Sequence, residues 1–305
     1  MGIIDFEFKR ERKLGEFVQD FINLLKLIYK HLVVVLFRLL VIPICLILLL
    51  SYYISTQLSF NADYSDQDYF NIAMTIGGMV LGVMIVSLFA IGFAIEYFIL
   101  MRDRKSIDFN HSDVWNQFKQ NIYYYFRYFG AMLVVGILVS IPVAIGVFLA
   151  ALIPFIGSFA AGILFSIIGL WFFVAFMLYR EGYYDLMDCF GSALTVIKSK
   201  MLEYGLASYI VSFIFQSMLG IMAIMPAVIF FVISYNFIGF DNNFFESGLG
   251  RMIATGGGLL ITLLFIVYYM MAVLSYGIIY ETAKELQFGE DVYERIEKLG
   301  GEKNA

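Results

Sequence analysis

The sequence predicts an all-α polytopic membrane protein, and three observations support this fold class. Hydrophobic residues make up 61% of the 305 residues and charged residues only 15%, whereas water-soluble domains are about 45–50% apolar and about 25% charged. Apolar runs long enough to cross a bilayer recur along the chain. An amphipathic pattern with helical spacing also recurs three times. Together they predict a single integral membrane domain over residues 1–305.

The apolar runs predict six transmembrane helices. A helix needs about 20 apolar residues to cross a hydrocarbon core of about 30 Å. The predicted spans cover residues 32–54, 71–100, 128–150, 155–179, 204–236 and 252–280. Residues 1–31 carry charges of both signs without a signal-peptide pattern, so we expect an N-terminal cytoplasmic segment with its own helix, a bundle over 32–280 and a cytoplasmic tail over 281–305.

The basic residues predict the orientation, because cytoplasmic flanks of membrane spans are enriched in Lys and Arg. With six spans and a cytoplasmic N-terminus, 19 of the 20 Lys and Arg residues fall on one face, and only Arg251 falls on the other. The opposite face carries two acidic segments, 61–70 and 236–250. We therefore expect both termini in the cytoplasm and the protein in the bacterial cytoplasmic (inner) membrane.

Residues 113–127 form the most informative amphipathic segment. Val114, Phe118, Ile122 and Tyr125 repeat with helical spacing, and amide and basic residues fill the other side. Such a segment is too polar to span and suits the headgroup plane, so we predict an interfacial helix that turns into the bilayer near Phe129 and Gly130. Two alternatives remain open: a polar extension of a long helix, or a cap on the bundle that does not touch lipid.

The same pattern precedes each odd-numbered span, which predicts an internal repeat. Phe21, Phe118 and Phe190 take the same place in the three segments. The chain is thus predicted as three units, each an interfacial helix followed by a transmembrane hairpin. Its partners are expected to be membrane lipids; anionic lipids and an unidentified membrane protein partner are both compatible with the pattern. The candidate lipid-facing basic residues are Lys26, Lys30, Lys119, Arg127, Lys198 and Lys200.

Arg38 and Glu96 are the ionisable residues within the predicted spans. Each costs about 2.5–3.5 kcal/mol at a helix centre on insertion scales, so such residues are candidates for function. Their similar depth predicts an intramembrane ion pair, with snorkelling to the headgroups or a proton- or ion-coupled site as alternatives. Gln216 and Ser217 are polar residues at mid-span in the fifth helix, where hydrogen bonding between helices and a solute pathway are both compatible readings.

Small residues predict close helix contacts in two places. Gly78 and Gly82 have the GxxxG spacing, and Gly256, Gly257 and Gly258 form a run in the sixth span. No phosphate loop, nucleophile motif or metal-ligand spacing is present in the sequence. Basic residues alternate with acidic ones, which argues against nucleic-acid binding. We therefore predict a protein that is not an enzyme and that uses no cofactor.

Two segments carry a resemblance to a known group: "DCFGSALTVIKSKMLEYGLASYIVSF" (188–213) and "YETAKELQFGEDVYERIEKLG" (280–300). With the repeated helix and hairpin, the chain resembles bacterial six-span proteins that include the membrane domain of glycerophosphodiester phosphodiesterases. The catalytic barrel of those enzymes is missing from this sequence, so the resemblance implies no hydrolytic activity. The expected function is that of an accessory, scaffold or regulatory membrane component that acts through its cytoplasmic helices. The alternative is a transporter of a lipid-like or amphipathic molecule.

Overall fold

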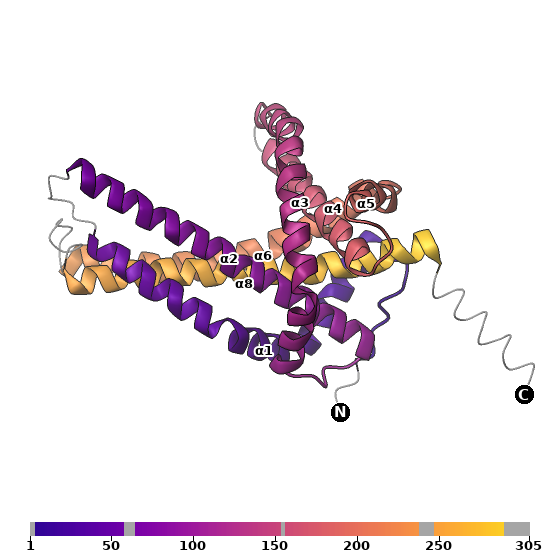
Figure 1. Ribbon diagram of the computed structural model, residues 1–305, viewed down its shortest axis with the longest axis horizontal. Coiled ribbons are helices and arrows are strands. Elements are labelled where there is room, and N and C mark those ends of the chain that lie inside the picture. The colour runs from indigo at the N-terminus through magenta and orange to yellow at the C-terminus, as the bar shows by residue number, and fades with distance from the viewer. Residues whose placement is uncertain (1–3, 58–64, 154–155, 238–246, 290–305) are drawn as a thin grey trace, which may run out of the picture. The chain divides into compact units, whose positions relative to one another are not determined.

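All regular elements are helices in the part of the chain that the computed structural model describes, residues 4–57, 65–153, 156–237 and 247–289. They are α1 (Leu14–Gln57), α2 (Asp66–Arg104), α3 (His111–Ala151), α4 (Ile156–Arg180), α5 (Asp188–Lys198), α6 (Met201–Phe237) and α8 (Gly248–Phe288) (Figure 1). Six of these, all except α5, are long and apolar enough to cross a membrane. The predicted all-helical fold with six candidate spans is therefore confirmed.

Two of the three amphipathic segments are continuous with the span that follows them. α1 runs unbroken from Leu14, and α3 runs unbroken from His111 through Phe129 and Gly130. The turn predicted at these two residues is therefore absent, because the helical pattern continues across them without a proline to interrupt it. The third segment does form a separate helix, α5, which ends two residues before α6 begins.

A capping box fixes the start of α3. The Asn110 side chain accepts the backbone N–H of Ser112 at 2.8 Å, and the backbone N–H of Asn110 donates to the Asp113 carboxylate at 2.8 Å. These bonds satisfy N–H groups that have no partner within the helix. The polar start of the segment is thus encoded locally as a helix N-terminus.

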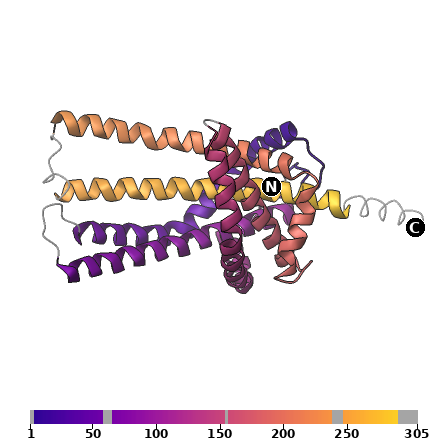
Figure 2. The same ribbon diagram turned by 90° about the horizontal axis from the view of Figure 1, so that it is seen from above.

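The chain was predicted as one membrane domain, and its residues group into two compact units. Unit 1 comprises Met1–Leu32, Ile95–Phe213 and Ala272–Ala305, and unit 2 comprises Val33–Ala94 and Ile214–Met271. α1, α2, α6 and α8 each contribute residues to both units, whereas α3, α4 and α5 lie wholly in unit 1. The four helical segments of unit 2 extend in one general direction (Figure 2).

Aromatic packing forms the core of unit 1. α4 contacts both α3 and α5. The Tyr125 ring of α3 lies 4.8 Å from that of Phe176 in α4, and Tyr128 stacks on Phe190 of α5 with 5.4 Å between ring centroids. Phe118 lies 4.9 Å from Tyr125. Offset and edge contacts of this kind add about 0.5–1.5 kcal/mol per pair to the effect of burial.

The apolar faces of the amphipathic segments pack against protein. Phe21, Phe118 and Phe190, which share one place in the predicted repeat, are 1%, 2% and 6% exposed. Their neighbours on the same faces, such as Ile28 and Tyr125, are also buried. The wide apolar stripe that predicted insertion into lipid is therefore used by the core of unit 1. Since α1 and α3 also continue unbroken into the spans that follow, these two segments agree with the alternative of a polar extension of a long helix.

Close contacts at glycines occur in unit 1 and not where the sequence predicted them. A Cβ atom on Gly169 would meet the Tyr276 side chain at 2.5 Å, and one on Gly277 would meet Phe98 at 2.7 Å. By contrast, no described neighbour lies within 4 Å of a Cβ built on Gly78, Gly82 or Gly256–258. Glycine spacing alone marks a small surface without showing which helix reaches it, so this prediction is corrected.

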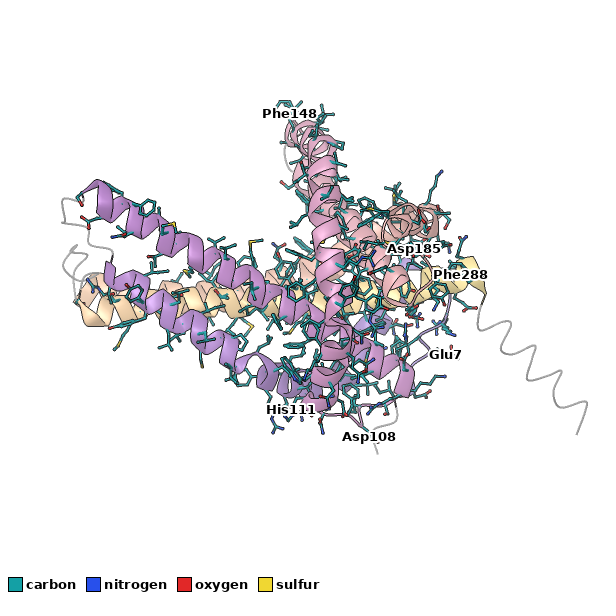
Figure 3. All side chains as sticks on the ribbon, in the orientation of Figure 1. Glu7, Asp108, His111, Phe148, Asp185 and Phe288 are labelled. Carbon is teal, nitrogen blue, oxygen red and sulfur yellow. The ribbon has the colours of Figure 1, made fainter. Side chains whose placement is uncertain are left out.

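A large apolar surface of α3 faces away from protein. The helix extends from His111 to the region of Phe148, at the end of the α3–α4 hairpin (Figure 3). None of the residues in its most apolar 18-residue window is buried. Ile137, Leu138 and Ile141 are each at least 67% exposed. A surface of this kind is compatible with contact to hydrocarbon and would be an aggregation hazard in water.

Phe118 and Phe126 of α3 allow a matched test of the core. Phe118→Ala should lower the free energy of unfolding by about 3–5 kcal/mol, because it leaves a cavity in a packed core. Phe126→Ala, on the exposed side of the same helix, should change it by less than about 0.5 kcal/mol. Unfolding in mixed detergent micelles measures both values, and equal losses in the two variants would contradict this core.

Candidate functional site

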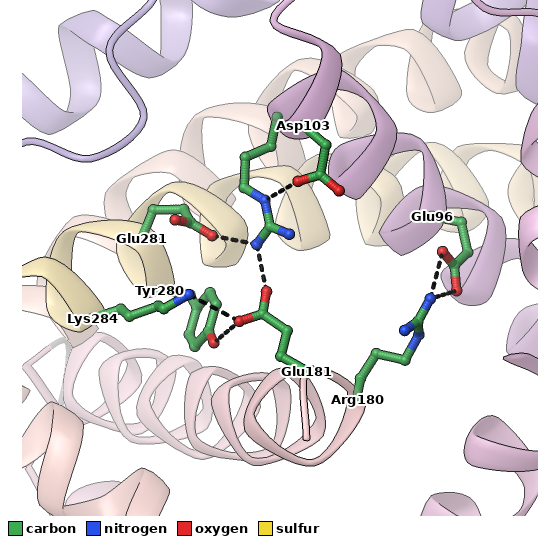
Figure 4. A network of polar contacts seen from close by, with 8 residues as sticks. Glu96, Asp103, Arg180, Glu181, Tyr280, Glu281 and Lys284 are labelled. Carbon is green, nitrogen blue, oxygen red and sulfur yellow. Dashed lines mark hydrogen bonds and ion pairs between the residues drawn. The ribbon is translucent and has the colours of Figure 1, made fainter. Parts of the chain in front are cut away.

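A buried ion-pair network joins the polar ends of α2, α4 and α8 within unit 1 (Figure 4). Arg102 of α2 lies at its centre. Its Nη1 donates to Glu181 Oε1 at 2.5 Å and to Glu281 Oε1 at 2.6 Å. The side chains of Arg102, Glu181 and Glu281 are 16%, 14% and 1% exposed. One guanidinium therefore binds two carboxylates from different helices, away from bulk water.

Glu181 has further partners on α8. Tyr280 Oη donates to its Oε2 at 2.7 Å, and Lys284 Nζ lies 3.1 Å from the same oxygen. Arg102 and Lys284 thus offset the charges of Glu181 and Glu281. Burial by itself raises the pKa of Glu181, but the positive charges of Arg102 and Lys284 outweigh it, so the pKa lies below its ordinary value. Glu181 is therefore ionised at neutral pH.

A second ion pair involves Glu96 and corrects the predicted partner. The Glu96 carboxylate is fully buried, lies 3.4 Å from Nη2 of Arg180, and accepts the Tyr125 hydroxyl at 3.0 Å. Arg38, the partner predicted from depth in the membrane, is exposed on α1 and belongs to unit 2. Depth along a helix does not reveal the direction in which a side chain points. Glu96 points toward α3 and the end of α4.

The sequence contains a signal for this network that the search for intramembrane charges missed. Three pairs with an acidic second residue lie at or just after the polar parts of α2, α4 and α8; the first residue is Arg in two of them and Tyr in the third: Arg102–Asp103, Arg180–Glu181 and Tyr280–Glu281. An aromatic residue precedes each pair by four positions: Phe98, Phe176 and Tyr276. Each pair read alone resembles ordinary charges flanking a membrane span. The recurrence of such pairs near the ends of three apolar helices was the sequence signal for the network.

Arg12 forms another set of buried hydrogen bonds near the start of the chain. Its side chain is 1% exposed and donates to Asp20 at 2.8 Å, to the Phe8 carbonyl at 3.1 Å and to Thr282 of α8 at 3.1 Å. The sequence placed Arg12 only among the basic residues of the predicted cytoplasmic face. In the structure it attaches the segment before α1 to the polar end of α8.

Most of the predicted lipid-facing basic residues are exposed. Lys26 and Lys30 on α1, Lys119 and Arg127 on α3, and Lys198 on α5 all have exposed side chains. Lys200 instead pairs with Glu11 at 2.6 Å, and this contact lowers the pKa of Glu11 and raises that of Lys200. The structure therefore leaves five of these six cations directed away from the core.

Exposed aromatic residues accompany these cations. Lys30 lies 5.9 Å from the centre of the Tyr29 ring, and Arg127 lies 6.0 Å from that of Tyr123. Trp115 is 43% exposed on the same stretch of α3. We call these exposed residues the basic–aromatic rim; its members are Lys26, Tyr29, Lys30, Trp115, Lys119, Tyr123 and Arg127.

The polar mid-span residues do not line a described cavity. Gln216 and Ser217 of α6 are exposed and belong to unit 2. Among the residues described, no group of three or more His, Cys, Asp or Glu side chains is placed to hold a metal ion. His31 instead contacts the Tyr97 hydroxyl at 3.0 Å and the Phe109 carbonyl at 2.8 Å.

No protein family, curated protein or solved structure matches this chain in sequence or fold comparisons. The site is therefore interpreted from its own geometry. In that geometry buried charges of opposite sign neutralise one another, and such contacts are suited to holding helices together.

Glu181→Gln should destabilise the protein by about 3 kcal/mol at pH 7, because Arg102 and Lys284 lose a buried counter-charge. The pKa of Glu181 is depressed in the folded state, so its contribution is complete above the ordinary value of 4.5 and is lost as pH falls below it. The difference in melting temperature between wild type and Glu181→Gln should therefore shrink below pH 4.5.

Asp103→Asn is the matched control for this experiment. Asp103 also contacts Arg102, at 2.8 Å, but its side chain is 53% exposed, so its loss should cost less than about 1 kcal/mol. Equal effects of the two substitutions, or a difference between wild type and Glu181→Gln that stays constant to pH 3.5, would contradict the assigned role of Glu181.

Proposed function

We propose that the protein is a non-catalytic component of the bacterial cytoplasmic membrane that supports, anchors or regulates a membrane partner or process. In this proposal both termini face the cytoplasm, as the distribution of Lys and Arg favours. Unit 1 lies at the inner membrane surface, where its basic–aromatic rim binds anionic lipid headgroups. The kinship with the six-span group that contains phosphodiesterase membrane domains is part of the same proposal.

The basic–aromatic rim is the observation that carries this proposal. Tyr and Trp are enriched where membrane helices meet water, and Lys and Arg near that level attract anionic lipids. On α1 and α3 such residues are exposed, while Phe21 and Phe118 of the same segments are buried in protein. Part of each segment thus packs the core, and the exposed part carries the cations and aromatic rings that we propose meet headgroups.

The ionisable groups support a structural role for unit 1. Catalytic acids and bases need accessible groups with pKa values matched to proton transfer. The described carboxylates of the network bind cations or hydroxyl groups instead. Burial also raises the pKa of the Cys189 thiol to about 12, which keeps the sulfur in its unreactive form at neutral pH.

A transporter of a lipid-like or amphipathic molecule is the alternative function. It is favoured by hydroxyl groups without hydrogen-bond partners on α6 and α8, at Tyr204, Ser208 and Ser275. Polar groups inside a membrane bundle often mark a route for a solute.

A measurement of lipid translocation distinguishes the proposed supporting role from transport of a lipid-like molecule. Under the proposed function, proteoliposomes should move a fluorescent phosphatidylglycerol between leaflets no faster than protein-free liposomes. Dithionite quenching measures this movement. Acceleration that depends on the amount of protein reconstituted would favour the transporter.

Added phosphatidylglycerol should raise the melting temperature of the detergent-solubilised protein more than phosphatidylcholine does, since each cation near the surface contributes about 1 kcal/mol of attraction to anionic lipid. Replacing Lys26, Lys30, Lys119 and Arg127 with Gln should remove most of this difference. The charge-preserving variant Lys26→Arg, Lys30→Arg, Lys119→Arg, Arg127→Lys is the control and should retain it. A full response in the Gln variant would rule out the rim as the lipid site.

A further inference from the structure

A small cavity lies within unit 1 where the start of α1 meets α6 and α8. Its volume is about 10 Å³, which is room for one water molecule. Its walls are formed by Arg12, Leu14, Phe17, Glu203, Tyr204, Ala207, Ile279 and Thr282. The segment before α1 and the first turn of α1 therefore close a space between two helices.

Tyr204, one of the residues that line this cavity, has an unpartnered hydroxyl group. The residue is 4% exposed, yet its hydroxyl has no hydrogen-bond partner in the structure. A buried hydroxyl without a partner loses its interactions with water and gains nothing in return, and such groups are rare in folded proteins. A buried hydroxyl of this kind calls for a ligand that forms hydrogen bonds.

Two more unpartnered hydroxyl groups lie beyond the cavity. Ser208 of α6 and Ser275 of α8 are both fully buried, and neither hydroxyl has a partner. Ser208 follows Tyr204 by one helical turn, and Ser275 precedes Ile279 by one turn. Because α6 leads away from its polar start and α8 leads toward its polar end, both serines lie on the same side of the cavity.

The charges around the cavity indicate a neutral ligand. The wall contains one cation, Arg12, and one anion, Glu203, so its formal charges balance. The Arg12 guanidinium is already bound to Asp20, Thr282 and backbone carbonyls. The volume excludes a headgroup or any solute with several heavy atoms. Thr282 Oγ1 accepts a bond from Arg12, so its own proton is available for a second partner.

We propose that this cavity is a water-binding site, in which Tyr204 and Thr282 hold the water and Ser208 and Ser275 continue the site as a hydrated seam between α6 and α8. The segment around Arg12 closes the seam at its polar end. This site requires neither the accessory role nor the transport role, because it follows from the packing of unit 1 alone.

The sign of a stability change tests the proposal. Tyr204→Phe and Ser208→Ala each remove a hydroxyl group with little other change. In a hydrated seam both substitutions break a hydrogen bond to water, and the melting temperature should fall by a few degrees. In a dry seam they remove an unsatisfied group, and the melting temperature should rise. A rise in either variant overturns the proposal.

Tyr280→Phe is the positive control, because the Tyr280 hydroxyl donates directly to Glu181 and its loss lowers stability whether the seam is wet or dry. X-ray radiolytic labelling gives an independent readout, since bound water generates hydroxyl radicals at buried positions. Tyr204 should be oxidised several-fold faster than Tyr97, which is equally buried and contacts His31. Equal labelling rates of the two tyrosines would overturn the proposal.

Discussion

The need to neutralise buried charge where apolar helices end governs the architecture of unit 1. Removing an ion from water costs several kcal/mol even after relaxation, so a buried charge persists only beside a partner of opposite sign. Arg102 satisfies this requirement for Glu181 and Glu281 at once. Because the three residues come from α2, from just after α4 and from α8, the requirement fixes which helix ends meet. The aromatic contacts then pack around that arrangement.

Helical amphipathicity has two uses in this protein. On α1 and α3 the apolar stripe is covered by protein, as the burial of Phe21 and Phe118 shows. The polar side carries exposed cations beside exposed aromatic rings. One continuous helix therefore provides a core contact, an exposed polar face and an apolar membrane-length segment, and no loop is needed between them. In the third segment the core contact and the polar face belong to α5, and the apolar membrane-length segment belongs to α6, because α5 ends before α6 begins.

The helices could be predicted from the sequence because their signal is local. Composition and run length identify an apolar helix without knowledge of its neighbours. The pairing of Glu96 was beyond this reasoning, because the direction of a side chain depends on how each helix is rotated against the next. The burial of Arg12 and Glu281 could not be predicted for the same reason: it is created by segments far away in the sequence. The glycine predictions failed similarly. Gly169 and Gly277 are crowded by aromatic rings of other helices, and the residues next to them in the sequence do not indicate these contacts.

The bond between Arg12 and Thr282 has a consequence for the order of assembly. Its two partners are 270 positions apart, so the ribosome releases Arg12 long before α8 exists. Until then the guanidinium has only partners close in the sequence, Asp20 and the Phe8 carbonyl, and its contact with Thr282 is missing. Closure of unit 1 is thus a late event in biogenesis, and a nascent chain arrested ahead of α8 exposes the Arg12 segment to proteases and chaperones.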